Sequence, residues 1–141
     1  MAITRGIDVL LAEANAVIRT IATDEAVGLH ADGSVTFVDI RDPRELERDG
    51  MVPGALHATR GMLEFWVDPA SPYHKPLFAD ETREFVLFCG AGWRSALAAK
   101  SLQDMGMTNV AHVDGGWAKW TAVRAPIESL EDNKARRKGA A

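Results

Sequence analysis

The sequence predicts an α/β fold in which a central, mostly parallel sheet of about five strands is flanked by helices on both faces. Short apolar segments at 35–40, 85–88 and 109–114 are rich in β-branched and aromatic residues, as is typical of buried strands. Segments with helical spacing or helix-capping residues lie between them. Strands that alternate with helices along a chain indicate a parallel sheet.

Length and composition fit one globular domain. The chain has 141 residues, of which 47% are hydrophobic and 26% are charged, enough for a core of its own. The net charge of −4 argues against a nucleic-acid or anionic-membrane partner. No apolar run approaches the roughly 20 residues that span a bilayer, and charged residues interrupt the N-terminal stretch, unlike a secretory signal. With a single unpaired cysteine, these features favour a cytoplasmic protein.

The first part of the chain is predicted to be helical. Apolar residues recur at helical spacing through residues 1–21, which are therefore expected to form a helical extension packed on the domain. Thr23 is a candidate N-cap for a second helix, and Gly33 is suited to end it. The strand at 35–40 follows directly.

Shorter elements are predicted for the middle of the chain. Asp42 suits the N-cap of a helix, because Pro43 occupies the first helical position and Glu45 the reciprocal capping position. The remaining expected elements are a short strand at 55–57, a helix from 61, and a proline-rich ordered loop at 67–80.

The last third of the chain repeats the alternation of strand and helix. A helix is expected from Ser95 to about Met105, with Gly106 at its C-terminal end. A short helix is expected from Trp117, after the strand at 109–114. Residues 128–141 are expected to form a charged, mobile tail.

The sole cysteine, Cys89, lies where a reactive thiol is expected. It follows the strand at 85–88 and precedes Gly90 and Gly92, after which a helix begins near Ser95. The N–H groups of such a loop and of a helix N-terminus bind anions and stabilise a thiolate, the nucleophilic form of cysteine. Cys89 is therefore a candidate nucleophile.

Two other interpretations compete with this one. A lone cysteine after an apolar strand is often a small buried residue. The spacing from Gly90 through Gly92 to Ser95 imitates a dinucleotide-binding fingerprint, but the third glycine is missing and only one strand–helix–strand unit remains. The two glycines let a ligand approach the backbone, which favours a binding site. Arg94 lies at a helix start, which prefers negative charge, so its position indicates either a compensating anion or a carboxylate partner.

Four separate blocks resemble the single-domain rhodaneses, a family of sulfurtransferases. Residues 37–41 resemble the family's first strand ending in Asp-x-Arg, 50–55 its Pro-Gly turn with Met51 in place of the usual histidine, 89–96 its active loop, and 113–117 its closing Gly-Gly block. The blocks follow the family's order, so a rhodanese domain is assigned to residues 22–127, and the fold is expected to be rhodanese-like.

This resemblance implies a sulfurtransferase that carries a persulfide on Cys89. The sulfur would come from a donor such as thiosulfate, with mercaptopyruvate less favoured, and would pass to cyanide or a thiol. The implied binding residues are Gly90, Ala91, Gly92, Trp93 and Arg94. No metal or organic cofactor is implied, and the expected partners are small-molecule donors and acceptors, with a protein thiol as an alternative acceptor. The oligomeric state is left open.

Two further hypotheses remain open. One is a rhodanese-like persulfide-sensing or protein-interaction module with little turnover. The other is a phosphatase or arsenate reductase. From Cys89 to Arg94 the loop has six residues, whereas the related phosphatases and arsenate reductases use a loop one residue longer around a tetrahedral oxyanion. The shorter loop favours sulfur chemistry.

Three residues outside the loop are expected to support it. Asp39 and Arg41 are interpreted as a structural pair at the end of a strand, with Asp39 also a candidate partner for Arg94. His57 follows the Pro-Gly turn and is a candidate pocket residue. Trp93, inside a tight loop at a helix start, is expected to be exposed.

Overall fold

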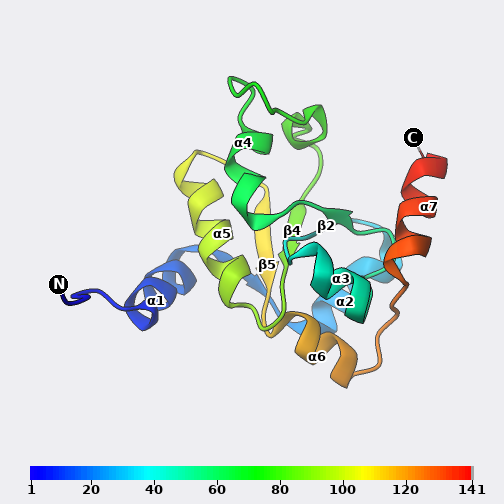
Figure 1. Cartoon of the computed structure of the whole chain (residues 1–141), viewed down its shortest axis with the longest axis horizontal. Coiled ribbons are helices and arrows are strands. Elements are labelled where there is room, and N and C mark those ends of the chain that lie inside the picture. Colours follow the sequence, from blue (N-terminus) through cyan, green and yellow to red (C-terminus); the bar gives the residue numbers. More distant parts are fainter. Residues whose placement is uncertain (141) are drawn as a thin grey trace.

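The computed structural model describes residues 1–140. Its centre is a five-stranded sheet in the order β1-β5-β4-β2-β3 with helices on both faces (Figure 1). Every neighbouring pair of strands is parallel. The strands are Arg19–Ile21 (β1), Thr36–Asp39 (β2), Leu56–His57 (β3), Phe85–Phe88 (β4) and Val110–Val113 (β5). The predicted α/β fold class is therefore confirmed.

The helices divide into two layers. They are Ile7–Val17 (α1), Thr23–Asp32 (α2), Pro43–Asp49 (α3), Leu63–Val67 (α4), Trp93–Asp104 (α5), Gly116–Ala122 (α6) and Leu130–Ala140 (α7), with 3-10 turns at Arg60–Met62 (η1) and Pro76–Ala79 (η2). Helices α4 and α5 contribute to one hydrophobic core, while α2, α3 and α6 contribute to a second core. The sheet separates the two.

Strand β4 lies at the middle of the sheet and is buried on both faces. Phe85 and Leu87 belong to the core under α5, and Val86 and Phe88 belong to the opposite core. This double burial explains why the strand is an unbroken apolar run. It also fixes the end of the strand, where Cys89 follows.

The N-terminal extension differs from the prediction. Its helix ends at Val17, and Arg19–Ile21 then forms strand β1, which pairs with β5. Ile21 is fully buried in the core. An apolar residue at this position fits the helical spacing of residues 1–21 as well as it fits a buried strand. Thr23 is not a cap either: the N-cap of α2 is Ala22, and the Thr23 hydroxyl donates to the Asp114 carbonyl at 3.2 Å.

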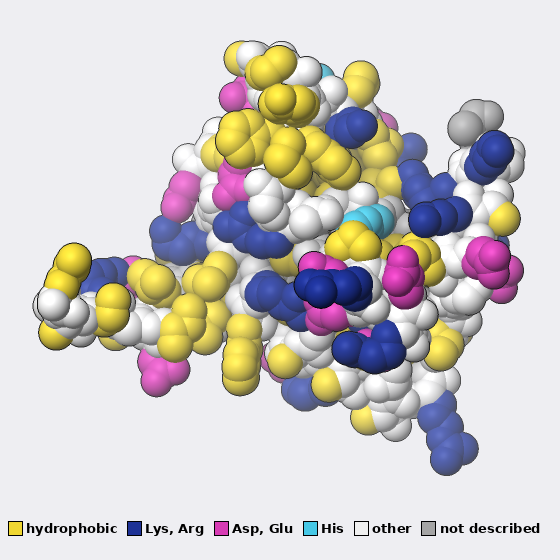
Figure 2. Space-filling view, viewed as in Figure 1, with side chains coloured by type: hydrophobic (Ala, Val, Ile, Leu, Met, Phe, Trp, Pro, Cys, Tyr) yellow, Lys and Arg dark blue, Asp and Glu magenta, His cyan; other side chains and the backbone are white. Residues whose placement is uncertain are grey.

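Helix α1 contacts α5 but leaves much of its apolar surface exposed. Ala14 is its one fully buried residue. Figure 2 shows hydrophobic side chains along this projecting arm; the exposed ones are Ile3, Ile7, Val9, Leu10 and Val17. Within residues 1–140, no helix has both the length and the apolar character to cross a membrane.

The charged segment 128–141, expected as a mobile tail, contains helix α7 up to Ala140. Asn133 is buried, and its side-chain amide donates to the Ala55 carbonyl at 3.0 Å. Glu128 accepts a hydrogen bond from the Gly54 N–H at 2.7 Å. These polar links tie the helix to the Pro-Gly turn, and hydropathy alone does not reveal such links.

Candidate active site

The Cys89 sulfur lies at the N-terminus of α5. Its Sγ accepts hydrogen bonds from the backbone N–H groups of Gly92, at 3.2 Å, and Ser95, at 3.4 Å. The Cys89 side chain is fully buried. Aligned N–H groups at a helix N-terminus stabilise negative charge, so this arrangement is suited to hold a thiolate.

The five loop residues singled out in the sequence take different positions around the sulfur. Among the described residues, Gly92 is the member of this set whose N–H reaches Sγ. Ala91, Trp93 and Arg94 are exposed on the outer side of the loop; Trp93, at 67% exposure, matches its expectation. Helix α5 begins at Trp93, two residues before the predicted start, which brings the Ser95 N–H into the first turn that faces the sulfur.

Glycines allow the loop to pack closely against the closing Gly-Gly block. Gly92 has a φ of +91°, and a Cβ there would lie 3.0 Å from the Gly115 nitrogen. A Cβ on Gly116 would lie only 2.2 Å from the Cys89 carbonyl oxygen. That carbonyl accepts a hydrogen bond from the Trp117 N–H at 2.8 Å. The start of α6 therefore supports the backbone of Cys89 from behind.

A chain of side-chain hydrogen bonds runs inward from the sulfur. The Cys89 thiol donates to the Ser95 hydroxyl at 3.3 Å. The Ser95 Oγ lies 2.9 Å from His112 Nδ1, and His112 Nε2 lies 3.1 Å from Thr20 Oγ1. Ser95 and His112 are buried, whereas Thr20 is exposed. Ser95, His112 and Thr20 were not among the site residues expected from the sequence. The one feature that could have indicated them is a histidine inside an otherwise apolar strand.

Arg94 is paired with Glu45 on α3 and not with Asp39, the candidate partner that the sequence suggested. The guanidinium forms two hydrogen bonds to the carboxylate, of 2.8 and 2.9 Å. They hold the pKa of Glu45 below its usual range and raise the pKa of Arg94. A Cβ on Gly90 would lie 3.0 Å from Arg94 Nη2, so Gly90 leaves room for this guanidinium.

Glu45 has a second role at the start of α3. It accepts a hydrogen bond from the Asp42 N–H at 2.9 Å, while the Asp42 side chain accepts one from the Arg44 N–H. The predicted capping box is therefore present. The same carboxylate caps a helix and binds the arginine of the loop.

Asp39 and Arg41 form a buried ion pair, in agreement with the structural role expected for them. Arg41 Nη2 lies 2.8 Å from Asp39 Oδ2, and both side chains are only 1% exposed. The guanidinium also donates to the Gly50 carbonyl at 2.7 Å and stacks on the Trp117 ring. This pair ties the end of β2 to the turn after α3 and to α6.

His57 supports the same strand end. Its Nε2 lies 2.8 Å from the Arg41 carbonyl oxygen, and its side chain is half-buried. Its hydrogen bond therefore goes to the backbone of the structural pair. This contact favours a positioning role beside the loop over direct contact with the sulfur.

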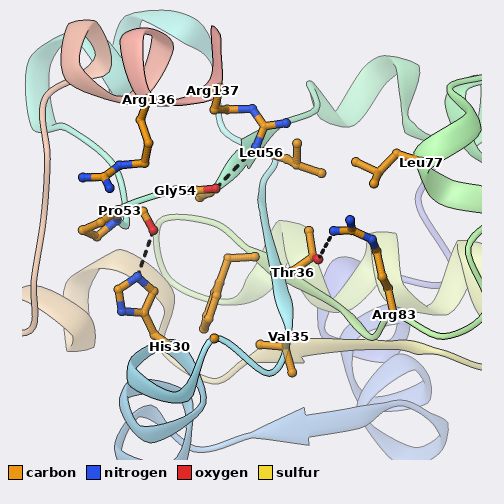
Figure 3. A pocket seen from close by; sticks show the side chains of 13 residues that line it. His30, Val35, Thr36, Pro53, Gly54, Leu56, Leu77, Arg83, Arg136 and Arg137 are labelled. Atoms are coloured by element: carbon orange, nitrogen blue, oxygen red, sulfur yellow. Dashed lines mark hydrogen bonds between the residues drawn. The ribbon is translucent and has the colours of Figure 1, made fainter. Parts of the chain in front are cut away.

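A cleft of about 470 Å³ lies at the amino-terminal ends of strands β2 and β3 (Figure 3). Arg83, Arg136 and Arg137 line it, and Arg83 donates to the Thr36 hydroxyl at 3.0 Å. Thr36 pairs with the first residue of β4, whereas Cys89 follows the last. The cleft and the cysteine loop are therefore separate, and the candidate active site is the loop.

Comparisons with known proteins agree with this fold and loop. A family model described as rhodanese-like domain matches residues 22–123. A solved structure from Rhodopseudomonas palustris is 55% identical, has a TM-score of 0.88 and covers 91% of this chain and 98% of its own. That protein is described as of unknown function and a possible tyrosine phosphatase.

Curated relatives are more distant. The thiosulfate sulfurtransferase GlpE of Pseudomonas entomophila is 30% identical over 82% of this chain and 94% of its own. Rhodanese-like domain-containing protein 17 of Arabidopsis thaliana is 28% identical over 69% of this chain, and a thiosulfate sulfurtransferase of Corynebacterium glutamicum is 30% identical over 75% of it. The chain spans only 65% and 42% of the lengths of these last two proteins.

Fold and site together define an α/β domain with a cysteine at the end of its central strand and the start of a helix. The chain belongs to the rhodanese-like domain family. The resemblance noted in the sequence is thereby confirmed.

Proposed function

We propose that the protein is a sulfurtransferase that carries a sulfane sulfur as a persulfide on Cys89. The observation that carries this proposal is the pair of N–H donors from Gly92 and Ser95 on the Cys89 sulfur at the start of α5. Relatives named as thiosulfate sulfurtransferases support the class of reaction. Thiosulfate is the proposed donor, and cyanide or a thiol is the proposed acceptor.

The reaction follows in two steps. The Cys89 thiolate attacks the outer sulfur of thiosulfate, the bond between the two donor sulfurs breaks, and sulfite leaves with the electron pair. The acceptor then attacks the outer sulfur of the persulfide, and the Cys89 thiolate is released. The N–H donors stabilise negative charge in both steps, and covalent storage of the sulfur gives ping-pong kinetics.

Access to the sulfur requires a local movement. Because Cys89 is fully buried, a donor reaches Sγ only when the loop shifts. The exposed outer residues Ala91, Trp93 and Arg94 are the part of the loop that a donor meets first.

A phosphatase is the second candidate, because the relative from Rhodopseudomonas palustris is described as a possible tyrosine phosphatase. Two features favour sulfur instead. The loop from Cys89 to Arg94 is short, and Arg94 is held by Glu45 on its outer side. A phosphate cradle needs that guanidinium turned towards the oxyanion.

Intact-mass spectrometry tests the proposal directly. Separate samples of the protein are incubated with thiosulfate and with mercaptopyruvate, and the intact mass of each is then measured. We expect the mass of one added sulfur atom with thiosulfate, its removal by cyanide with release of thiocyanate, and no gain in Cys89→Ala.

The alternatives give different results. Hydrolysis of para-nitrophenyl phosphate without any gain of sulfur would overturn the proposal in favour of a phosphatase. If a persulfide forms but its sulfur does not pass to cyanide or a thiol, the protein does not turn over. That result would overturn the proposed transferase and favour the sensing module.

A further inference from the structure

The hydrogen bonds that link Cys89, Ser95, His112 and Thr20 can be assigned donors and acceptors. His112 Nδ1 accepts from the Ser95 hydroxyl only if the imidazole carries its proton on Nε2. That proton then points to Thr20 Oγ1, 3.1 Å away. The Cys89 thiol in turn donates to Ser95 Oγ. In this tautomer the donors point from the sulfur towards Nδ1, whose lone pair accepts the Ser95 hydrogen bond and can take up a proton.

We propose that His112 is the positioning residue that receives the Cys89 thiol proton through the Ser95 hydroxyl and holds it during sulfur transfer. This inference rests on the proposed function and adds a proton acceptor to it. His112 does not touch the sulfur itself; it acts through Ser95.

The proton and charge balance is simple. The Cys89 S–H bond breaks as a new O–H bond forms on Ser95, and the original Ser95 proton moves to His112 Nδ1. The products are a thiolate and an imidazolium, and the Ser95 hydroxyl now donates to the sulfur. The imidazolium keeps its proton while the anionic persulfide exists, since sulfur transfer itself moves no proton.

The groups around His112 suit this exchange. Burial lowers the pKa of His112, and the carboxylate of Asp114 opposes that effect. The resting imidazole is therefore a neutral acceptor, and a thiolate formed nearby stabilises its protonated form. Asp114 is itself paired with Lys119.

The charges near the other end of the chain are already paired. Arg94 is bound to Glu45. Asp39 is bound to Arg41. These pairings leave His112 as the titratable group connected to the sulfur by hydrogen bonds among the described residues.

The hydrogen bonds behind Cys89 also involve the N-terminal extension. Thr20 belongs to β1, which lies outside the residues 22–123 that match the family model. In the tautomer that accepts from Ser95, the Thr20 hydroxyl oxygen accepts a hydrogen bond from the His112 Nε2–H. Strand β1 is therefore part of the active-site support and not only an addition to the sheet.

The test removes the basic group at position 112 but keeps an acceptor for the hydrogen bond from Ser95. In His112→Asn, the amide oxygen can accept from Ser95 where Nδ1 did, but it cannot hold a proton. His74→Asn is the matched control, because His74 bonds to the Trp66 carbonyl through Nδ1 away from the loop. Folding of each variant is checked by its thermal unfolding midpoint.

Two measurements follow ionisation and transfer separately. Cys89 is the sole cysteine, so selectively labelled [3-¹³C]cysteine gives one NMR signal whose shift follows thiol ionisation with pH. Single-turnover loading by thiosulfate is measured over the same pH range. The NMR titration does not depend on sulfur transfer, so a failure of the proposed function leaves it intact.

We expect His112→Asn to move the titration midpoint upward by about one pH unit or more, equivalent to about tenfold in thiolate population. Loading is then about tenfold slower below the wild-type midpoint and equal to wild type at high pH. Thr20→Val, at an exposed position, gives a smaller loss of about threefold, the scale of one hydrogen bond. His74→Asn behaves as wild type.

Two results would overturn the inference. One is an unchanged midpoint in folded His112→Asn. The other is a loading rate reduced by the same factor at every pH, which indicates that His112 only packs.

Discussion

The inner and outer sides of the cysteine loop are built on different principles. On the inner side, Cys89, Ser95 and His112 are buried and linked by hydrogen bonds. On the outer side, Trp93 and Arg94 are exposed, and Arg94 is held by one half-buried carboxylate. The inner side therefore fixes the position of the sulfur, whereas the outer side is open to solvent.

The two arginines near the loop illustrate the same difference. Arg41 and its partner Asp39 are each 1% exposed, whereas the side chain of Arg94 is 44% exposed. Removing one partner of a buried pair leaves an uncompensated charge in the protein interior. An exposed pair is screened by water and contributes little to stability. Arg41 therefore stabilises the fold, whereas the Arg94–Glu45 pair contributes little to stability.

The largest expected effect comes from breaking the buried pair. Asp39→Ala leaves the Arg41 guanidinium without its carboxylate, and we expect a loss of about 3–5 kcal/mol in the free energy of unfolding. Denaturation in urea measures this loss. Asp104→Ala is the control, since it removes the exposed partner of Lys100 on α5 and is expected to cost about 0–1 kcal/mol. Equal losses in both variants would remove the distinction between the two kinds of pair.

The next largest effect is expected at Gly116, where the start of α6 packs against the Cys89 backbone. In Gly116→Ala, the added Cβ would lie 2.2 Å from the Cys89 carbonyl oxygen, at a φ of +49°. The backbone of Cys89 must move, at a cost of about 1–3 kcal/mol, and the N–H donors lose their alignment with Sγ. Sulfur loading and the urea midpoint should both fall.

Gly28→Ala is the matched control for this substitution. Gly28 lies inside α2, and a Cβ there meets nothing within 4 Å. Alanine is favoured over glycine in a helix, so the control should be as stable as wild type or slightly more stable. A Gly116→Ala protein that loads sulfur at the wild-type rate would show that the loop does not depend on α6.

Residue type and spacing were sufficient to predict the central strand, one helix start and the position of the cysteine, but not every buried element. The strand at 85–88, the capping box at Asp42 and the cysteine between strand and helix were all predicted from residue type and spacing. Strand β1 was missed because Ile21 fits a helical stripe as well as a strand. Its pairing with β5 is a tertiary contact, which overrides local preference.

The missed site residues have a related cause. Asp39 was a candidate partner for Arg94, but Glu45 on helix α3 binds this arginine. His112 sits within an apolar strand, and its relation to Cys89 depends on the neighbouring positions of β4 and β5. Charge and residue type identify candidates, but the packing of elements distant in sequence decides which of them meet.

The smallest effect on stability is expected on the outer side. Glu45→Gln weakens the link to Arg94 and should cost about 0–1 kcal/mol in unfolding free energy. The freed guanidinium should bind the dianionic donor better, so the KM for thiosulfate falls by about two- to tenfold, less at high salt because exposed charges are screened. Steady-state kinetics with thiosulfate and cyanide measure this change. Glu47→Gln, an exposed residue of the same helix, controls for the altered net charge.

Acidity should have the same effect as this substitution. Because Arg94 holds the pKa of Glu45 below its usual range, the stability from this pair is present above the ordinary carboxyl range and is lost as pH falls through the lowered value. Protonation there frees Arg94 in wild type but changes nothing in Glu45→Gln. The KM advantage of the variant should therefore shrink as the pH approaches that value. An advantage that stays constant with pH would mean that it does not arise from release of Arg94 by Glu45.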